Sequence, residues 1–292
     1  MQNKLPNLVN IPPFVLRIYD INSVNSFMKL YILIKGKFTQ LVLKFTSGTL
    51  FCMLINFLFS KDANIKFENN FYSKKINNEI EIFYPNKRIT RVINAENFIF
   101  QNIYDAYCLD KVNFKTDDLI IDCGANVGEL NISLKLRGLN VRYFGIEPDK
   151  STFECLLKNK LSEGAKFKNI ALSNSNGNEK LFLDNLGGNS SIIFFGNDEY
   201  DLVETKTLDS FNISEKIKLF KIEAEGYEPE VLEGSNKTLK LVEFVTIDFG
   251  SERGEKQENT VVQSNNILTS NGFELVDFSN IRTIGLYKNK AI

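Results

Sequence analysis

The sequence predicts an α/β protein built around a doubly wound, mostly parallel sheet. From Asp117 onward, short apolar runs alternate with segments of helical periodicity, which is the pattern of repeated strand–helix units. The first run, residues 119–121, is apolar at every position, as expected for a strand buried on both faces. It leads directly into a glycine-rich turn and then a helix. Together these observations favour an open sheet with helices on both faces.

Each element of this domain, residues 117–292, follows from its local pattern. Glycines mark where several helices end, because a glycine accepts the left-handed backbone that terminates a helix. Strands are expected at 119–121, 141–146, 167–172, 219–222, 241–247, 273–278 and 283–287, and helices at 130–136, 151–161, 228–233 and 260–269.

Two segments precede this domain. Residues 61–116 are predicted to form a layer of short strands and one helix: a strand at 80–84 ends at Pro85-Asn86, and a helical pattern covers 97–112. Residues 1–60 are predicted to form a helical docking extension outside the catalytic fold. Their first 13 residues hold three prolines and no continuous apolar run, so no secretory signal is expected.

The most apolar stretch of the chain is residues 41–59. Polar residues interrupt it between Lys44 and Thr49 and again at Asn56, and its uninterrupted part, 50–59, is too short to cross a bilayer. Three interpretations stay open: a buried or docking helix, a helix lying in the membrane interface, and a true span. We expect a cytoplasmic protein with peripheral membrane contact through this stretch.

Composition excludes several classes of function. The 292 residues carry 35 Lys and Arg against 36 Asp and Glu, so the net charge of -1 gives no electrostatic reason to bind nucleic acid. Histidine is absent, which rules out histidine-based triads, histidine-bound zinc and a histidine general base. The four cysteines have no metal-binding spacing and indicate a reducing compartment. Acid–base chemistry must therefore use Asp, Glu, Lys, Tyr or Cys.

The strongest sequence motif is the turn at residues 122–128. Gly124 and Gly128 allow a tight turn with close backbone approach, and amides at the start of the following helix would face a polar or anionic ligand. Glu147 ends the next strand, where a carboxylate can accept both ribose hydroxyls of a nucleotide-like ligand. A dinucleotide fingerprint needs a glycine where Asn126 stands, so the turn favours S-adenosylmethionine (SAM) over NAD. We therefore assign donor binding to Asp122, Gly124, Asn126, Gly128, Glu147, Pro148 and Ala171.

These motifs resemble those of FkbM-type methyltransferases. The resemblance rests on IIDCGANVG at 120–128, FGIEPD at 144–149, TLD at 207–209 and KIEAEGYEPEVLEG at 221–234, and it covers roughly residues 80–288. It implies a class I methyltransferase with a seven-stranded sheet that uses SAM, often for O-methylation of sugars or related glycosidic products. One position departs from the family pattern, because Glu223 stands where the family usually has Asp.

The acceptor side is predicted at the ends of the strands at 219–222 and 241–247. Glu223, Glu225 and Asp248 lie there. Glu223 and Glu225 crowd a short loop together with Glu228, and like charges this close should raise at least one pKa. Nothing basic adjoins them in sequence after Lys221. We expect Glu223, Glu225 and Asp248 to be catalytic, with Glu223 the first choice of general base. Alternatively these carboxylates hold Mg²⁺, although no set of metal ligands is assigned. Tyr227 and Phe249 are expected to supply apolar walls, and the acceptor to be a small molecule or glycan with neutral hydroxyls.

Two other functions remain open at this point. A catalytically silent methyltransferase-like binding module is supported by Glu223, whose extra methylene moves the carboxylate. An NAD-dependent oxidoreductase shares the sheet, but it would need the missing second glycine.

Overall fold

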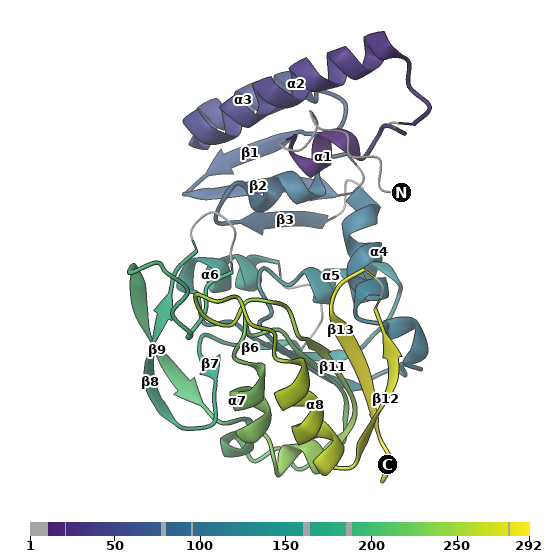
Figure 1. Ribbon diagram of the computed structural model, residues 1–292, viewed down its shortest axis with the longest axis vertical. Coiled ribbons are helices and arrows are strands. Elements are labelled where there is room, and N and C mark those ends of the chain that lie inside the picture. Colours follow the sequence, from purple (N-terminus) through teal and green to yellow (C-terminus); the bar gives the residue numbers. More distant parts are fainter. Residues whose placement is uncertain are drawn as a thin grey trace. The chain divides into compact units, whose positions relative to one another are not determined.

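The computed structural model describes residues 11–20, 22–76, 80–94, 96–159, 164–184, 189–279 and 281–292. The chain divides into two compact units, residues 1–99 and 100–292 (Figure 1). This division differs from the one predicted at 60 and 116. The strands of the predicted middle layer belong to the first unit, because they share a core with the helices before them. The ring of Phe51, for example, packs edge-on against Tyr72 with 5.6 Å between centroids.

The first unit combines three described helices, all within the predicted extension at 1–60, with an antiparallel sheet formed by the predicted middle layer. Its described elements are α1 (Pro13–Leu16), α2 (Ser26–Phe45), α3 (Gly48–Leu58), β1 (Ile65–Glu68), β2 (Phe71–Ile76), β3 (Ile80–Tyr84) and the 3-10 turn η1 (Lys87–Val92). The strands follow one another in the order β1-β2-β3. Asn56 fixes α3 to β1, since its side chain both donates to and accepts from the Ile65 backbone at 2.8 Å.

The apolar stretch at 41–59 does not form one continuous helix. α2 ends at Phe45 and α3 begins at Gly48, whose φ of +58° turns the chain between them. Among the described residues, no helix is both long and apolar enough to traverse a bilayer.

The second unit contains the predicted doubly wound sheet. Its seven described strands lie in the order β12-β13-β11-β10-β4-β5-β6, and only the pairings of β13 are antiparallel. The strands are β4 (Leu119–Cys123), β5 (Arg142–Ile146), β6 (Lys166–Lys168), β10 (Ile217–Ile222), β11 (Val242–Asp248), β12 (Phe273–Phe278) and β13 (Ile284–Asn289). The chain runs from β4 to one side and later returns as β10 on the other. The switch point of the topology therefore lies between β4 and β10.

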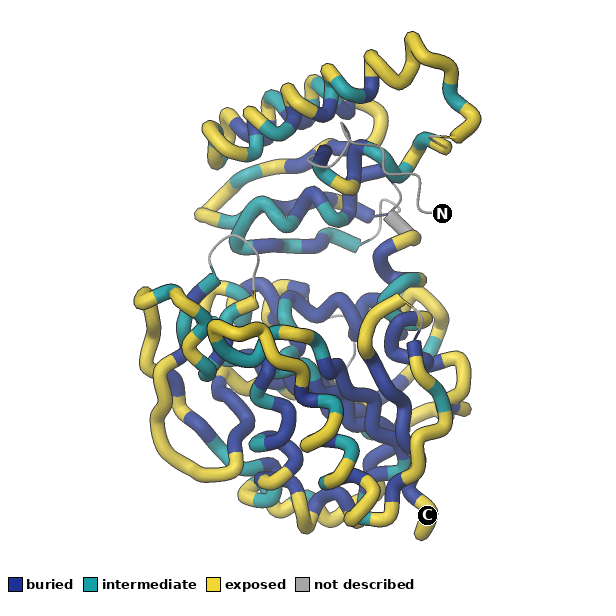
Figure 2. Tube along the Cα trace, viewed as in Figure 1, coloured by how far each residue is buried: buried dark blue, intermediate teal, exposed yellow. Residues whose placement is uncertain are grey.

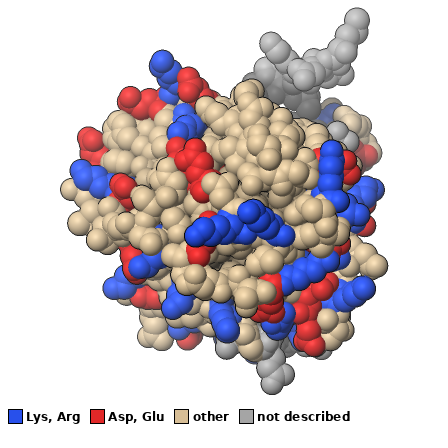
Figure 3. Space-filling view, turned by 90° about the horizontal axis from the view of Figure 1, so that it is seen from below, with Lys and Arg blue, Asp and Glu red and all other residues tan. Residues whose placement is uncertain are grey.

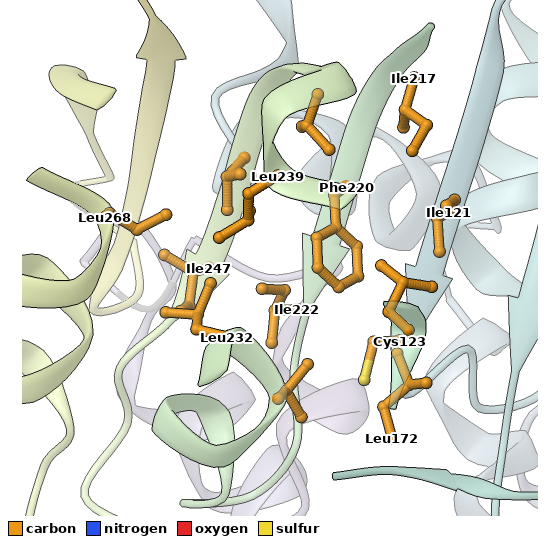
Figure 4. Packing of buried hydrophobic residues seen from close by; sticks show 14 of the residues in the cluster. Ile121, Cys123, Leu172, Ile217, Phe220, Ile222, Leu232, Leu239, Ile247 and Leu268 are labelled. Atoms are coloured by element: carbon orange, nitrogen blue, oxygen red, sulfur yellow. The ribbon is translucent and has the colours of Figure 1, made fainter. Parts of the chain in front are cut away.

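Apolar side chains cover both faces of this sheet, as the continuous apolar strands predict. Ile120 and Ile121 are adjacent in β4, point to opposite faces and are both fully buried. Ile121 packs in a cluster with Phe220, Leu232 and Leu268, which joins the sheet to α7 (Glu228–Glu233) and α8 (Val261–Ser270) (Figure 4). Ile120 packs on the other face with α4 (Glu96–Ala106) and α5 (Glu129–Leu136). In Figure 2 these central strands form the continuous buried part of the unit.

The predicted strand at 167–172 is two strands in different sheets. β6 ends at Lys168, while β7 (Ala171–Leu172) pairs with β9 (Tyr200–Lys206), which in turn pairs with β8 (Gly177–Phe182). Asn169 separates them, since its side chain donates to the backbone carbonyls of Glu147 at 2.9 Å and Pro148 at 2.8 Å and so turns the chain. Strands β8 and β9 were not predicted from the sequence.

Two predicted helices differ from their expected lengths. The helix expected at 97–112 ends at Ala106, because Cys108 adopts a left-handed backbone with φ +55° before the short 3-10 turn η2 (Leu109–Lys111). Helix α6 (Lys150–Lys158) replaces the helix expected at 151–161, and the end of that prediction lies outside the described residues.

Charged side chains of both signs share the surface. On the face seen in Figure 3, Lys and Arg lie interspersed with Asp and Glu. This agrees with the nearly equal numbers of basic and acidic residues, 35 and 36.

Asp209, in the 3-10 turn η3 (Leu208–Phe211), joins the segment before β10 to the segment after α7. Its carboxylate accepts hydrogen bonds from the backbone of Lys237 and from both the backbone and the hydroxyl of Thr238, at 2.8–3.1 Å. Thr238 begins the 3-10 turn η4 (Thr238–Leu241) and is 3% exposed, so water cannot readily replace this partner. The TLD motif at 207–209 thus has a structural role.

We therefore predict that Asp209→Ala lowers the free energy of unfolding by about 1–3 kcal/mol, because buried donors lose their acceptor. Asp209→Asn keeps one acceptor oxygen and should lose less. Asp201→Ala, at an exposed site on β9, serves as the control and should change stability by less than about 0.5 kcal/mol. Urea unfolding of the three variants measures this, and equal stability of Asp209→Ala and parent would show that the contacts contribute nothing.

Candidate functional site

The register of four neighbouring strands gathers the predicted site residues at one edge of the sheet. Ile146, Cys123, Ile222 and Ile247 lie side by side across β5, β4, β10 and β11. One position further along are Glu147, Gly124, Glu223 and Asp248, which sequence analysis had placed in separate motifs. This row crosses the switch point between β4 and β10, where open α/β sheets bind ligands.

A buried lysine links the two halves of the row. The Lys221 ammonium lies 2.9 Å from Asp122 and 3.2 Å from Glu223, and it donates to the carbonyls of Cys123 at 3.2 Å and Gly124 at 2.7 Å. Burial lowers the pKa of Lys221, but the carboxylates of Asp122 and Glu223 outweigh it and raise that pKa well above the usual value. Lys221 therefore stays charged and holds the β4 turn against β10.

Asp122 has a second partner on β5. The Tyr143 hydroxyl donates to its carboxylate. Gly145 lies beside Asp122 in the register, and a Cβ there would come within 2.9 Å of the Tyr143 ring. The glycine thus leaves space for the tyrosine to reach the aspartate.

The glycine-rich turn is shaped by close contact with β10. A Cβ on Gly124 would lie 1.9 Å from the Glu223 carbonyl oxygen, and the φ of +71° also requires glycine. The backbone amides of residues 124–128 all donate within the protein, to Ile146, Glu147, Asn126 and Ala125. These hydrogen bonds stabilise the shape of the turn. The expectation about amides at the start of the following helix, α5, concerns residues from Glu129 onward and stays a prediction.

Glu147 is fixed by the turn that it faces. Its two carboxylate oxygens accept from the backbone amides of Asn126 at 2.8 Å and Asp149 at 3.0 Å. Burial raises the pKa of Glu147 to about 7, although both amides act against this rise. Each oxygen keeps a further lone pair, so the geometry fits acceptance of two ribose hydroxyls, and we propose this role for Glu147.

The Glu223 carboxylate is surrounded by donors. The Tyr107 hydroxyl donates to one oxygen, Arg282 donates to the other at 2.6 Å, and Lys221 lies beside it. Burial by itself would raise the pKa of Glu223, but Lys221 and Arg282 together hold it far below its usual range. No basic residue follows Glu223 closely in the sequence, but the loop before β13 brings in Arg282 from 59 positions away.

The pKa of Glu225 is raised, as the crowding of the loop predicted, and the pKa of Asp248 is raised as well. Burial, then the charges of Glu223 and Glu252, raise the pKa of Glu225 to about 10, so its side chain is a neutral acid at pH 7. Burial and then Glu223 raise the pKa of Asp248 to about 7, while Arg282, which forms an ion pair with Asp248, acts against the rise. Asp248 is held by the Gly250 amide at 3.0 Å.

The structure also shows the surroundings of four further residues that the sequence assigned to the donor or acceptor site. Ala171, in β7, is buried in a cluster with Leu181, Leu183 and Val203, and Pro148 follows Glu147 in the loop, so donor binding by these two residues stays a prediction. Phe249 is fully buried with its ring against Tyr287, so it cannot form the predicted wall of an acceptor site. The Tyr227 hydroxyl lies 3.2 Å from Ser173.

Four polar residues of this network were given no role in the site from the sequence: Tyr107, Tyr143, Lys221 and Arg282. Lys221 carried a detectable signal, because a lysine inside the apolar run LFKI is costly to bury without partners. Tyr143 directly precedes the motif at 144–149, but nothing in the sequence points its hydroxyl at Asp122. Tyr107 and Arg282 lie far from the motifs in sequence, and only the fold brings them in.

The carboxylates do not fit a divalent cation. Within the described ranges, no group of three or more acidic or cysteine side chains is placed to hold a metal ion. Glu223 and Asp248, the nearest candidates, share Arg282 as their partner. The expectation of Mg²⁺ thus finds no support in the geometry.

Comparison with known families decides the class. Residues 122–275 match the model of the methyltransferase FkbM domain. The chain belongs to this family. It is a SAM-dependent methyltransferase with the class I fold, and the oxidoreductase alternative is set aside.

One curated relative and two solved structures illustrate the similarity. Methyltransferase sdnD of Sordaria araneosa is 25% identical over 218 residues, which are 61% of this chain and 82% of that protein. The plantazolicin methyltransferase BpumL in complex with SAH is 12% identical with a TM-score of 0.40, over 68% of this chain and 87% of that one. Precorrin-6y C5,15-methyltransferase from Geobacter metallireducens is 11% identical with a TM-score of 0.38, over 63% and 88% of the two chains. Similarity this low says nothing about the acceptor of this FkbM methyltransferase.

We predict that Lys221→Met lowers the free energy of unfolding by about 3–5 kcal/mol, because it leaves the buried Asp122 and Glu223 carboxylates without their shared cation. Lys218→Met is the matched control on the same strand. Lys218 is also largely buried, but within the described residues its ion pair is with the half-buried Glu243 alone, at 3.1 Å, so its loss should cost about 1 kcal/mol. Thermal and urea unfolding compare the two, and similar losses would refute the special role of Lys221.

The raised pKa of Glu147 predicts pH-dependent donor binding. Since the ionised carboxylate is the better acceptor for ribose hydroxyls, SAM affinity should fall as the pH drops below about 7. Glu147→Gln should weaken binding by about 1–3 kcal/mol at pH 8 and remove this dependence. Calorimetry from pH 5.5 to 8.5 tests both points, with the exposed Glu154→Gln as control. A variant with the parent's affinity at pH 8 would remove Glu147 from the ribose site.

Proposed function

We propose that this methyltransferase methylates a hydroxyl oxygen of a neutral acceptor, a sugar or glycan-like molecule, with Asp248 as general base. The observation that supports the proposal is the position of Asp248 together with its raised pKa. It lies in the same row of strand ends as Glu147, and burial and Glu223 raise its pKa to about 7. A base with this pKa is available at neutral pH and still accepts a proton readily.

The three predicted catalytic carboxylates divide into different roles on this proposal. Glu223 is a weak base because Lys221 and Arg282 keep it ionised, and it serves to hold Arg282 in place. Glu225 is protonated at neutral pH, so it can donate a hydrogen bond to an acceptor oxygen but cannot take its proton. Asp248 is left as the group that can do so.

Asp248 is 2% exposed, and the Arg282 guanidinium covers it. Arg282 itself is 40% exposed in its side chain, so solvent and acceptor can reach it. An acceptor hydroxyl that replaces the Arg282 contact would meet the Asp248 carboxylate, while Glu223 retains the arginine.

The proposed step conserves atoms and charge. SAM supplies an electrophilic methyl group on a positively charged sulfur. Asp248 takes the hydroxyl proton as the acceptor oxygen bonds to the methyl carbon, and the pair from the broken sulfur–carbon bond stays on sulfur. The products are a methyl ether and S-adenosylhomocysteine. The protein contributes alignment and a site where charges of opposite sign are cancelled away from water.

The charge balance of the site supports a neutral acceptor. Lys221 and Arg282 are already paired with carboxylates, so neither offers a free charge to a phosphate or carboxylate group. Glu223 and Asp248 would repel an anion. Aliphatic hydroxyls remain the group that both accepts and donates hydrogen bonds at such a site without added charge.

We place this chemistry in the cytoplasm. Cys52, Cys108, Cys123 and Cys155 are all buried with free thiols, which supports a reducing compartment.

A methyl-transfer screen tests the acceptor class. Purified protein and SAM carrying a labelled methyl group are incubated with neutral glycosides, their phosphorylated forms, amines and carboxylic acids. We expect label in the neutral glycosides only, in a product that withstands mild base as an ether does. Label released by base would indicate a methyl ester, and label in the amines would overturn O-methylation.

The pH profile of turnover tests the base. At saturating SAM the parent rate should rise with pH through about 7, since only ionised Asp248 accepts a proton. Asp248→Asn should keep donor affinity and lose about 10²–10⁴-fold in turnover, with the rise abolished. Glu223→Gln removes a charge that adds to burial in raising the pKa of Asp248, so the midpoint of the rate's rise with pH should move below 7. Rates should be unaffected by EDTA. A parent-like profile in Asp248→Asn would exclude this base, and loss of activity in EDTA would transfer the role to a metal.

A further inference from the structure

The helical pair α2 and α3 exposes a continuous apolar face. On α2, Phe27, Ile34, Leu41 and Phe45 recur at intervals of seven, seven and four residues, which places them on one side of the helix. Met53 and Phe57 do the same on α3. These six side chains are between 53% and 81% exposed, although each is large and apolar.

The core of the first unit does not account for this face. The opposite side of α2 packs inward through Ile32, Gly36 and Thr39, all of which are buried. Gly36 lies so close to Ile11 that a Cβ would come within 2.6 Å of it. α2 therefore has a packed inner side and an apolar outer side that is exposed. Figure 2 shows buried and exposed positions alternating along both helices. Exposed apolar patches of this kind mark interaction surfaces.

The charges around this face have one sign. Between Asp20 and Asp62 the chain has five lysines and neither an acidic residue nor an arginine, although the whole chain has a net charge of -1. Lys37 and Lys44 are exposed and lie two helical turns apart, next to Leu41 on the helix surface. Their ammonium groups thus border the apolar face.

We propose that α2 and α3 dock in the plane of an anionic lipid bilayer, with the apolar face inserted at the level of the headgroups and the lysines on the phosphates. An amphipathic helix with an apolar face bordered by lysines is the pattern of interfacial binding. A second copy of the chain fits less well, because it would bring lysines of equal charge together. This surface extends the apolar stretch predicted from sequence at 41–59 to the whole outer side of α2.

Vesicle flotation of the full-length protein tests the proposal. Phosphatidylcholine vesicles are compared with vesicles that contain about 30% phosphatidylserine. The triple variant Ile34→Ser, Leu41→Ser, Met53→Ser removes apolar contact, and Lys37→Gln with Lys44→Gln removes charge. Leu202→Ser with Val262→Ser, at sites of 72% and 68% exposure elsewhere in the chain, is the matched control.

We expect the parent to bind anionic vesicles at least about 10-fold more strongly than neutral ones. The affinity of the triple variant for anionic vesicles should be about 10-fold or more below that of the parent. The lysine variant should lose a similar factor on anionic vesicles and keep the parent's weak affinity for neutral ones. The control should stay within about twofold. Unchanged SAM affinity, by calorimetry, confirms that each variant is folded and separates this test from the proposed reaction.

Three results would overturn the proposal. One is a parent that floats with neither kind of vesicle. Another is a triple variant that floats as well as the parent. The last is a parent that sediments as a dimer and becomes a monomer in the triple variant, which would assign the face to a second copy. Equal binding to both vesicle types would overturn the selectivity for anionic lipid.

Discussion

The site depends on one buried ammonium group, that of Lys221. An unpaired charge in an apolar strand would be strongly destabilising, so Lys221 needs partners on every side. Asp122 and Glu223 supply opposite charge, and the carbonyls of Cys123 and Gly124 accept hydrogen bonds from the ammonium. These partners belong to the donor turn and to the acceptor loop. The lysine therefore fixes the distance between the two halves of the site, which methyl transfer requires to be short.

The parallel register turns this local arrangement into a site. Glu147, Gly124, Glu223 and Asp248 each follow one row of paired residues. A shift of β5, β10 or β11 by one position would therefore remove a carboxylate from the row, and a shift of β4 would remove the glycine. Gly124 reinforces this constraint, since the Glu223 carbonyl leaves no room for a side chain. Structural and functional demands thus fall on the same residues of the FkbM motifs.

The distribution of cations explains why the pKa values of three neighbouring carboxylates differ. Burial favours the neutral form of each, but Glu223 lies between Lys221 and Arg282 and stays ionised. At Glu225 the charges of Glu223 and Glu252 add to burial, and the side chain takes a proton. Asp248 has one cation, Arg282, and one strong repulsion, from Glu223, and it titrates near neutrality. The replacement of the family's Asp by Glu223 leaves a carboxylate that still reaches Tyr107, Lys221 and Arg282, so it gives no sign of a disabled site.

The sequence by itself determined the sheet, its helices, the donor turn at 122–128, and the three carboxylates, because apolar periodicity and glycine placement are local properties of the chain. It also determined that carboxylates so crowded must differ in pKa. Only the tertiary structure decided which carboxylate has a lowered pKa and which have raised ones, because Arg282 and Tyr107 reach Glu223 from distant segments. It likewise split the strand expected at 167–172, where Asn169 bonds to carbonyls two elements earlier. It also placed the strands at 61–116 with the helices before them, because burial of shared apolar faces, which no local pattern records, sets the boundary of a folded unit.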